Sequence, residues 1–359
     1  LQDMSYDIAS IEEVIMSFDS MEHRDLIHEV SFDHYGRRLA TCSADMFVCI
    51  WDREHTGRWK KAASWKIHGG PTWRVAWAHP EFGQVIASCS NDRSVYIWEE
   101  IVNEDPVRWV KKANFADSRT AVTDIKFSPH FMGLLLGTAS AKGVFCVYEA
   151  PDVTDLSQWS MIHEILPFYY RISSFSWSCN QGTRPLIAFG CDDLKASNEE
   201  RLTLYELNEG VRRWQPLSAI RDSEAAPVTD VAFSPAVTMM GHLLAIAVGD
   251  VRLYHLAVRQ SGTHRLPDAT NPTAYQRQTI AVLGDAYKAW RLTFNITGNA
   301  LTISTADGSI RVWKSLFFDQ WKLVSTASPY EKDEAVRSRA NMLSEDHEER
   351  DDTRHLAYY

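Results

Sequence analysis

Residues Pro71 to Glu99 read Pro-Thr-Trp-Arg-Val-Ala-Trp-Ala-His-Pro-Glu-Phe-Gly-Gln-Val-Ile-Ala-Ser-Cys-Ser-Asn-Asp-Arg-Ser-Val-Tyr-Ile-Trp-Glu. Three short runs rich in β-branched and aromatic residues, Trp73–Trp77, Val85–Ser90 and Ser94–Trp98, are separated by turn-like segments. This pattern predicts a meander of three strands. A single meander cannot bury both of its faces, so its meaning depends on whether it recurs.

The meander recurs six times along the chain. The first-strand runs are Ile27–Phe32, Trp73–Trp77, Val122–Phe127, Ile172–Trp177, Val228–Phe233 and Trp290–Phe294. The second-strand runs are Leu39–Ser43, Val85–Ser90, Leu134–Ser140, Leu186–Gly190, His242–Val248 and Ala300–Thr305. The third-strand runs, which end in an aromatic residue, are Phe47–Trp51, Ser94–Trp98, Val144–Tyr148, Leu202–Tyr205, Val251–Tyr254 and Ser309–Trp313. The terminal aromatics recur about every 50 residues, close to the period of a four-stranded propeller blade.

A fourth, outer strand is then required in each gap, and an aromatic residue marks its place. These markers are Trp59, Trp109, Trp159, Trp214, Tyr275 and Trp321. Several of the segments that follow them carry Lys or Arg, which keeps an edge strand from pairing with other chains. We therefore predict an all-β propeller with six complete blades.

Composition and charge narrow the class further. The 359 residues are 45% hydrophobic, with a net charge of −10, which argues against direct nucleic-acid binding. The sequence has neither an apolar stretch of about 18 residues nor a secretory signal, so we expect no membrane insertion. Six cysteines lie in apolar runs without paired spacing, which predicts buried, reduced thiols. They are Cys42, Cys49, Cys89, Cys146, Cys179 and Cys191.

Several motifs resemble those of WD-repeat proteins. Third strands end in Trp51-Asp52 and Trp98-Glu99, and His68-Gly69 precedes a first strand. The resemblance implies a structural hydrogen-bond network in the blades. Its expected members are His68, Ser88, Asp92 and Trp98, with Asp45, Trp51, Asp307 and Trp313 in the first and last blades.

Within that family, the stretches beginning at His23, Gly36, Trp73 and Asp117 resemble the small coat propellers of the nuclear pore and of the COPII vesicle coat. Glu149-Ala-Pro-Asp-Val and the stretch from Trp290 to Gly298 are more similar to the Seh-type nucleoporin than to its COPII sister. The resemblance covers about residues 20–325. It implies a scaffold subunit rather than an enzyme.

One strand-like segment precedes the first blade and has no place in the six sets of four. It comprises Val14, Ile15, Met16, Ser17 and Phe18, and its register is that of an outer strand. Because Trp321–Ser325 already serves the last blade, we expect an open ring with a seventh blade that lacks three strands. Such a ring exposes apolar faces and strand edges unless a partner covers them. Alternatively, Val14–Phe18 closes a six-bladed ring and Trp321–Ser325 is a loop.

The resemblance implies that the missing strands come from an α-solenoid nucleoporin, which donates a three-stranded blade. It further implies that the protein lies at the nuclear envelope and has other subunits of the Y-shaped nuclear pore coat as partners. It also implies a second role in the SEA/GATOR nutrient-signalling complex, at the vacuolar or lysosomal membrane surface. The rivals are a COPII vesicle-coat propeller and a peptide-reading WD-repeat adaptor. The adaptor predicts exposed Arg and aromatic residues at the channel mouth and a closed ring.

The predicted domains are an N-terminal extension at residues 1–9, the propeller at 10–328 and a charged tail at 329–359. An engineered leftover ahead of Met4 is one reading of the extension, and the tail reads as solvated or partly helical. No catalytic residue, cofactor site or metal site is predicted. His79-Pro-Glu81 and His163-Glu164 lack zinc-site spacing, and Asp192-Asp193 fits an exposed turn.

Overall fold

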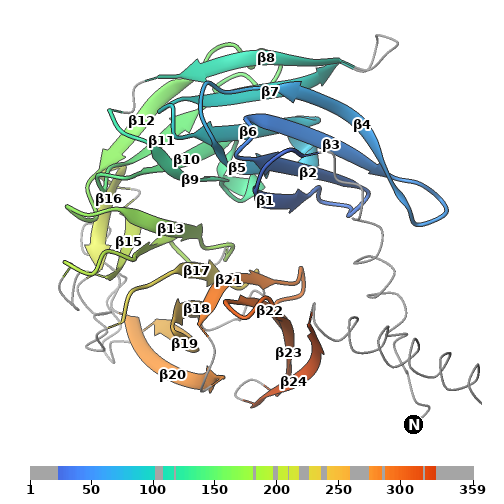
Figure 1. Cartoon of the computed structure of the whole chain (residues 1–359). Coiled ribbons are helices and arrows are strands. Elements are labelled where there is room, and N and C mark those ends of the chain that lie inside the picture. The colour runs from blue at the N-terminus through green and yellow to red at the C-terminus, as the bar shows by residue number, and fades with distance from the viewer. Residues whose placement is uncertain are drawn as a thin grey trace, which may run out of the picture.

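The structure is a computed structural model that describes residues 23–101, 108–116, 119–180, 183–196, 201–208, 210–217, 226–235, 241–258, 275–284, 288–317 and 320–328. Within these ranges, 24 strands form six antiparallel sheets of four strands each. The sheets stand around a common axis as the blades of a propeller (Figure 1). The predicted all-β class and the six-bladed propeller are confirmed. Val14–Phe18 and the tail lie outside the described residues.

Strands follow one another in chain order across each blade, from the axis to the rim. Blade 1 contains β1 (Ile27–Phe32), β2 (Arg38–Ser43), β3 (Phe47–Arg53) and β4 (Trp59–Lys66). Blade 2 contains β5 (Thr72–Trp77), β6 (Val85–Ser90), β7 (Val95–Ile101) and β8 (Arg108–Phe115). Blade 3 contains β9 (Val122–Phe127), β10 (Leu135–Ser140), β11 (Phe145–Glu149) and β12 (Ser160–Ile165).

The second half of the chain repeats this order. Blade 4 contains β13 (Ile172–Trp177), β14 (Leu186–Cys191), β15 (Leu202–Asn208) and β16 (Arg213–Leu217). Blade 5 contains β17 (Asp230–Phe233), β18 (Gly241–Val248), β19 (Asp250–Val258) and β20 (Tyr275–Leu283). Blade 6 contains β21 (Ala289–Phe294), β22 (Ala300–Thr305), β23 (Ile310–Phe317) and β24 (Gln320–Ala327). The 3-10 turns η1 (Pro80–Phe82) and η2 (His130–Met132) join inner to second strands.

The outer strands begin at, or within one residue of, the aromatic markers predicted for them. In the last blade, β24 pairs with β23 in register from Ile310 opposite Ala327 to Phe317 opposite Gln320. The alternative in which Trp321–Ser325 is a loop is therefore wrong, and blade 6 has four strands of its own.

Alternation of side chains along each strand places one apolar layer on each side of a blade. In blade 2, Ile86 and Trp98 face blade 1, whereas Ala87 and Ile97 face blade 3. Among the cysteines, Cys42, Cys49, Cys89 and Cys191 are buried and all six are free. Cys146 and Cys179 are only partly buried, so the prediction of buried thiols is confirmed for four of them.

One register-equivalent residue of each inner strand faces the central channel; it is the third residue of five of these strands and the first residue of β17. These residues are Glu29, Arg74, Asp124, Ser174, Asp230 and Arg291. Three of them reach the next blade: the Phe175 amide donates to Asp124 (3.2 Å), the Val231 amide to Ser174 (2.9 Å) and the Leu292 amide to Asp230 (2.9 Å). The channel wall is thus a chain of polar links from blade to blade.

Candidate functional site: the seam between the first and last blades

The junction between blade 6 and blade 1, which we call the seam, differs from the other five. A cluster of buried apolar residues fills each junction from blades 1 and 2 to blades 5 and 6. Among the described residues no such cluster joins blade 6 to blade 1. The inner strands of successive blades pack side by side, but β21 and β1 make little contact. In Figure 1 the blue first blade and the orange-red last blade are the two ends of the array.

Blade 1 turns a poorly covered inner strand to the seam. Val30 and Phe32 of β1 correspond by register to Val75 and Trp77 of β5, which face blade 1 across a closed junction. Val30 is 44% exposed, whereas Val75 is 3% exposed. Phe32 is 49% exposed. These positions have the apolar character of a packed face without the neighbour that would pack it.

Blade 6 turns its opposite face to the seam. Ile310 corresponds by register to Val95 of blade 2, and it is 41% exposed where Val95 is 2% exposed. Thr302 of the same face is partly buried, whereas its counterpart Ala87 is fully buried against blade 3. Both faces of the seam therefore have the residue types of half a junction. Their exposure is confined to part of each face, because Leu39 and Trp51, on the blade 1 side, are buried in a small cluster with Trp59.

At the channel, an ionic contact spans the seam. The Glu29 carboxylate of β1 pairs with Arg74 of β5 and lies 3.9 Å from the Arg291 guanidinium of β21. Arg74 also approaches Asp124, at 3.3 Å. Burial lowers the pKa of Arg74, but the carboxylates of Asp124 and Glu29 outweigh burial, and the pKa is raised. Arg74 thus stays charged at the axis, while the link from Glu29 to Arg291 is long and weak.

The blade network expected at His68 is present around three of its four residues. The His68 ring lies 3.0 Å from the Ser88 hydroxyl and 3.2 Å from the Asp92 carboxylate. Asp92 also accepts the Gly69 amide at 2.8 Å, which fastens the turn to the loop before β5. The indole nitrogen of Trp98 is buried and finds no acceptor among the described residues. Burial lowers the pKa of His68 to about 4, although Asp92 partly offsets it.

Blade 1 has the complete network, and sequence analysis found only half of it. His23 lies 3.0 Å from Asp45 and 2.8 Å from the Thr41 hydroxyl, which also accepts the Trp51 indole N–H at 3.1 Å. Asp45 and Trp51 were predicted; His23 and Thr41 were missed. The signal was available, because His23 and Asp45 are separated by nearly the same number of residues as the pair in blade 2.

In blade 6, the predicted Asp307 makes hydrogen bonds within its own turn. Asp307 accepts the Ser309 amide at 2.9 Å and the Thr305 hydroxyl, and these hydrogen bonds lower its pKa to about 2. Trp313 packs against the cluster between blades 5 and 6. The predicted residues of this blade thus stabilise its own turn and its junction with blade 5, on the side away from the seam.

Two of the residues considered for chemistry in the sequence lie near each other. His79 lies 3.8 Å from Glu81, and both are solvent-accessible. In the described ranges, no group of three His, Cys, Asp or Glu side chains could hold a metal ion. No helix among them is long and apolar enough to cross a membrane.

One channel mouth carries part of what a peptide-reading adaptor would need. Trp73, Arg171 and Arg291 border a cavity of about 310 Å³, and the nearby Trp290 is 50% exposed. The closed ring that the adaptor also predicts is not observed, because the seam has no packed junction among the described residues.

The blade order, the turn networks and the period define this chain as a WD-repeat β-propeller. Residues 14–52 and 59–99 match the family described as "WD domain, G-beta repeat".

The particular family follows from relatives that the chain matches over most of their length. The chain is 45% identical over 313 residues to "Nucleoporin SEH1" of Caenorhabditis briggsae. The aligned residues make up 84% of this chain and 86% of the relative. It is 45% identical over 314 residues to "Nucleoporin SEH1" of Homo sapiens, with coverage of 84% and 85%. The chain belongs to the nucleoporin SEH1 family, and the predicted Seh-type resemblance is confirmed. This is not an enzyme family.

Proposed function

We propose that the chain is a non-enzymatic scaffold subunit of the Y-shaped coat of the nuclear pore complex, at the nuclear envelope. The relatives' name, nucleoporin, supports the location. The observation that carries the mechanism is the uncovered inner strand of blade 1, where Val30 is 44% exposed while its counterpart Val75 is buried. A scaffold propeller with such a face is built to be completed by another chain.

In this proposal an α-solenoid nucleoporin inserts three strands into the seam, and Val14–Phe18 provides the fourth strand of a seventh blade. Each of the six sheets already has four strands, so none requires Val14–Phe18 as an edge. Strand addition of this kind derives affinity from main-chain hydrogen bonds and specificity from alternate side chains.

The two seam faces specify the donated blade. On one side it must present apolar residues to Val30 and Phe32 of β1. On the other it must accommodate Ile310 together with the hydroxyl-bearing Thr302. Covering both faces would bury apolar surface, and each Å² buried would contribute about 25 cal/mol to the stability of the complex. The inserted blade would also replace the long contact between Glu29 and Arg291 with packed neighbours.

The same seam would serve a related solenoid subunit of the SEA/GATOR complex, at the vacuolar or lysosomal membrane surface. Other Y-complex subunits would bind elsewhere on the disc. Direct nucleic-acid contact and membrane insertion have no part in this proposal, in which the chain acts by clamping a solenoid and setting the curvature of a lattice.

Co-expression with the N-terminal part of a candidate α-solenoid nucleoporin tests the proposal. We expect a stoichiometric complex in which the amides of β1 and β23 become protected from hydrogen exchange, while those of β13 do not change. A monodisperse free chain with β1 already protected, and no complex with any solenoid, would contradict blade donation.

A further inference from the structure

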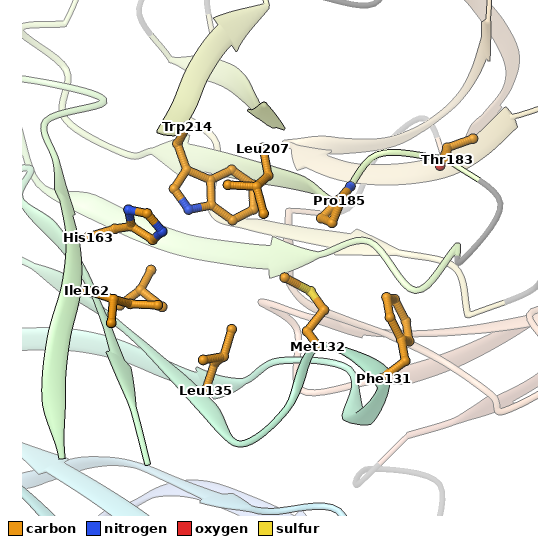
Figure 2. A pocket seen from close by; sticks show the side chains of 10 residues that line it. Phe131, Met132, Leu135, Ile162, His163, Thr183, Pro185, Leu207 and Trp214 are labelled. Atoms are coloured by element: carbon orange, nitrogen blue, oxygen red, sulfur yellow. The ribbon is translucent and has the colours of Figure 1, made fainter. Parts of the chain in front are cut away.

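A hollow lies between blades 3 and 4 on the rim of the propeller, remote from the seam. Its volume is about 330 Å³. Figure 2 shows side chains from both blades surrounding it. Met132, Leu135 and Ile162 come from blade 3, and Pro185, Leu207 and Trp214 come from blade 4. Most of the residues that line it are apolar, and His163 and Thr183 are the polar members, a mixture typical of sites that bind ligands.

The equivalent slot between blades 1 and 2 is filled by an ion pair. Arg38 is the first residue of β2, as Leu135 is the first residue of β10. Glu100 lies opposite Trp109 of the outer strand of blade 2, as Leu207 lies opposite Trp214 in blade 4. Arg38 and Glu100 form two hydrogen bonds across the junction, at 2.5 and 2.7 Å. The Arg38 guanidinium also covers the Trp109 ring, 5.7 Å from its centroid. Replacing this pair by Leu135 and Leu207 leaves the slot open and apolar.

The slot between blades 2 and 3 is filled in another way. Leu156 is 1% exposed there and belongs to the cluster between these blades, and the Trp159 indole N–H donates to the Leu156 carbonyl at 3.0 Å. Trp159 occupies the register position that Trp214 has in blade 4. The chain itself thus supplies both an apolar side chain and a carbonyl acceptor in that slot.

Trp214 has no such acceptor. The residue is 7% exposed, and its buried indole nitrogen has no hydrogen-bond partner among the described residues. The Trp109 indole is also unpaired, but the Arg38 guanidinium covers its ring, so only the Trp214 slot leaves room for an added acceptor. The Trp214 indole borders the hollow, with its nitrogen on the side of the His163 ring, which also lines it (Figure 2). An unpaired buried donor is costly, so an occupant that offers a carbonyl oxygen at this point gains more than one that offers only apolar surface.

The charge of the walls restricts the occupant. Burial lowers the pKa of His163, although Glu149 partly offsets this, so the ring is neutral at pH 7. No other residue that lines the hollow is ionisable. An inserted charge would lose its hydration without gaining a partner. The rim is apolar at Ile162, which is 37% exposed.

We propose that this groove binds an extended peptide segment of a partner protein, which inserts one uncharged side chain the size of leucine or phenylalanine and presents a main-chain carbonyl to the Trp214 indole N–H. The occupant reproduces what Leu156 and its carbonyl supply between blades 2 and 3. The site is separate from the seam, with β12 and β16 far from β1 and β21 around the ring (Figure 1). It therefore gives the scaffold a second attachment point, independent of blade donation.

The test selects binders from a displayed library of random dodecapeptides, using the full chain, and measures their affinity by fluorescence polarisation. The double variant L135R/L207E introduces between blades 3 and 4 the ion pair found between blades 1 and 2. It should weaken the binding of selected peptides at least tenfold. W214F removes the donor but keeps an aromatic wall and should weaken them roughly fivefold, the effect of one neutral hydrogen bond. W109F, the matched change in the filled slot, should have no effect.

Several outcomes would overturn the proposal. It is wrong if no peptide is recovered whose binding the double variant weakens at least tenfold, or if W214F and W109F bind equally well. A concentration-dependent dimer of the wild-type chain that L135R/L207E dissociates would assign the groove to a second copy instead. Melting temperatures establish that the variants fold; should the double variant fail to fold, the comparison of W214F with W109F decides alone.

Discussion

The same substitution at two equivalent positions measures whether the seam is covered. Val30 and Val75 occupy matching places on β1 and β5, but Val75 is 3% exposed within a closed junction and Val30 is 44% exposed. Val→Ala removes two methylene equivalents, about 1.6 kcal/mol at about 0.8 kcal/mol each when fully buried. With a cavity contribution, V75A should lower the free energy of unfolding by about 2 kcal/mol. V30A should lower it by only about 0.9 kcal/mol, because about half of the side chain is already in water.

Urea unfolding followed by tryptophan fluorescence gives both values for the free chain. The measurement is then repeated on the complex with the solenoid, where the cost of V30A should rise toward that of V75A. The reasoning is refuted if V30A costs as much as V75A in the free chain, since β1 would then be covered without a partner. It is also refuted if complex formation leaves the cost of V30A unchanged, since the partner would then not pack on β1.

Two further predictions concern the closed part of the propeller. The pKa of His68 is about 4 in the folded chain against 6.5 unfolded, so the unfolded state binds the proton first. The stability from neutral His68 is present above pH 6.5 and is lost as the pH falls toward 4, by about 3 kcal/mol. Urea titrations at several pH values should show this loss, and H68N should reduce it; an unchanged pH dependence in H68N would exclude His68 as the cause. The second change is R38M, which leaves the Glu100 carboxylate without its Arg38 partner; only 6% of the Glu100 side chain is exposed. We expect a loss of about 3 kcal/mol, with E100Q milder; thermal melts compare the two, and equal melting temperatures for R38M and wild type would contradict the ion pair's role.

Much of the propeller could be predicted from sequence because its determinants are local. Each outer strand begins at, or next to, an aromatic residue such as Trp59 or Trp321, and alternation within a run fixes which residues share a face. Asp45 and Trp51 could likewise be found from turn and strand-end motifs. His23 was missed because it precedes the first complete meander, and recognising it required the blade 2 spacing to be applied one blade earlier.

The groove between blades 3 and 4 was not predicted, and its origin explains why. Its walls, Leu135 and Leu207, are ordinary apolar strand residues when each is taken alone. Only their opposition across a junction, and the contrast with Arg38 and Glu100 in another blade, shows that a filling pair is absent. The same holds for the seam faces, where apolar sequence alone does not distinguish Val30 from the buried Val75.

The polar links along the channel run from each blade to the next, as from Asp124 to the Phe175 amide and from Asp230 to the Leu292 amide. An array of this kind, without a strong link between its ends, is a one-dimensional chain of nearest neighbours. Its two terminal units each lack one stabilising interface, so local opening costs least there and fraying starts at blades 1 and 6. A chain inserted at the seam would remove both ends at once and turn a linear array into a circular one. Its stabilising effect would then extend to blades that it never touches.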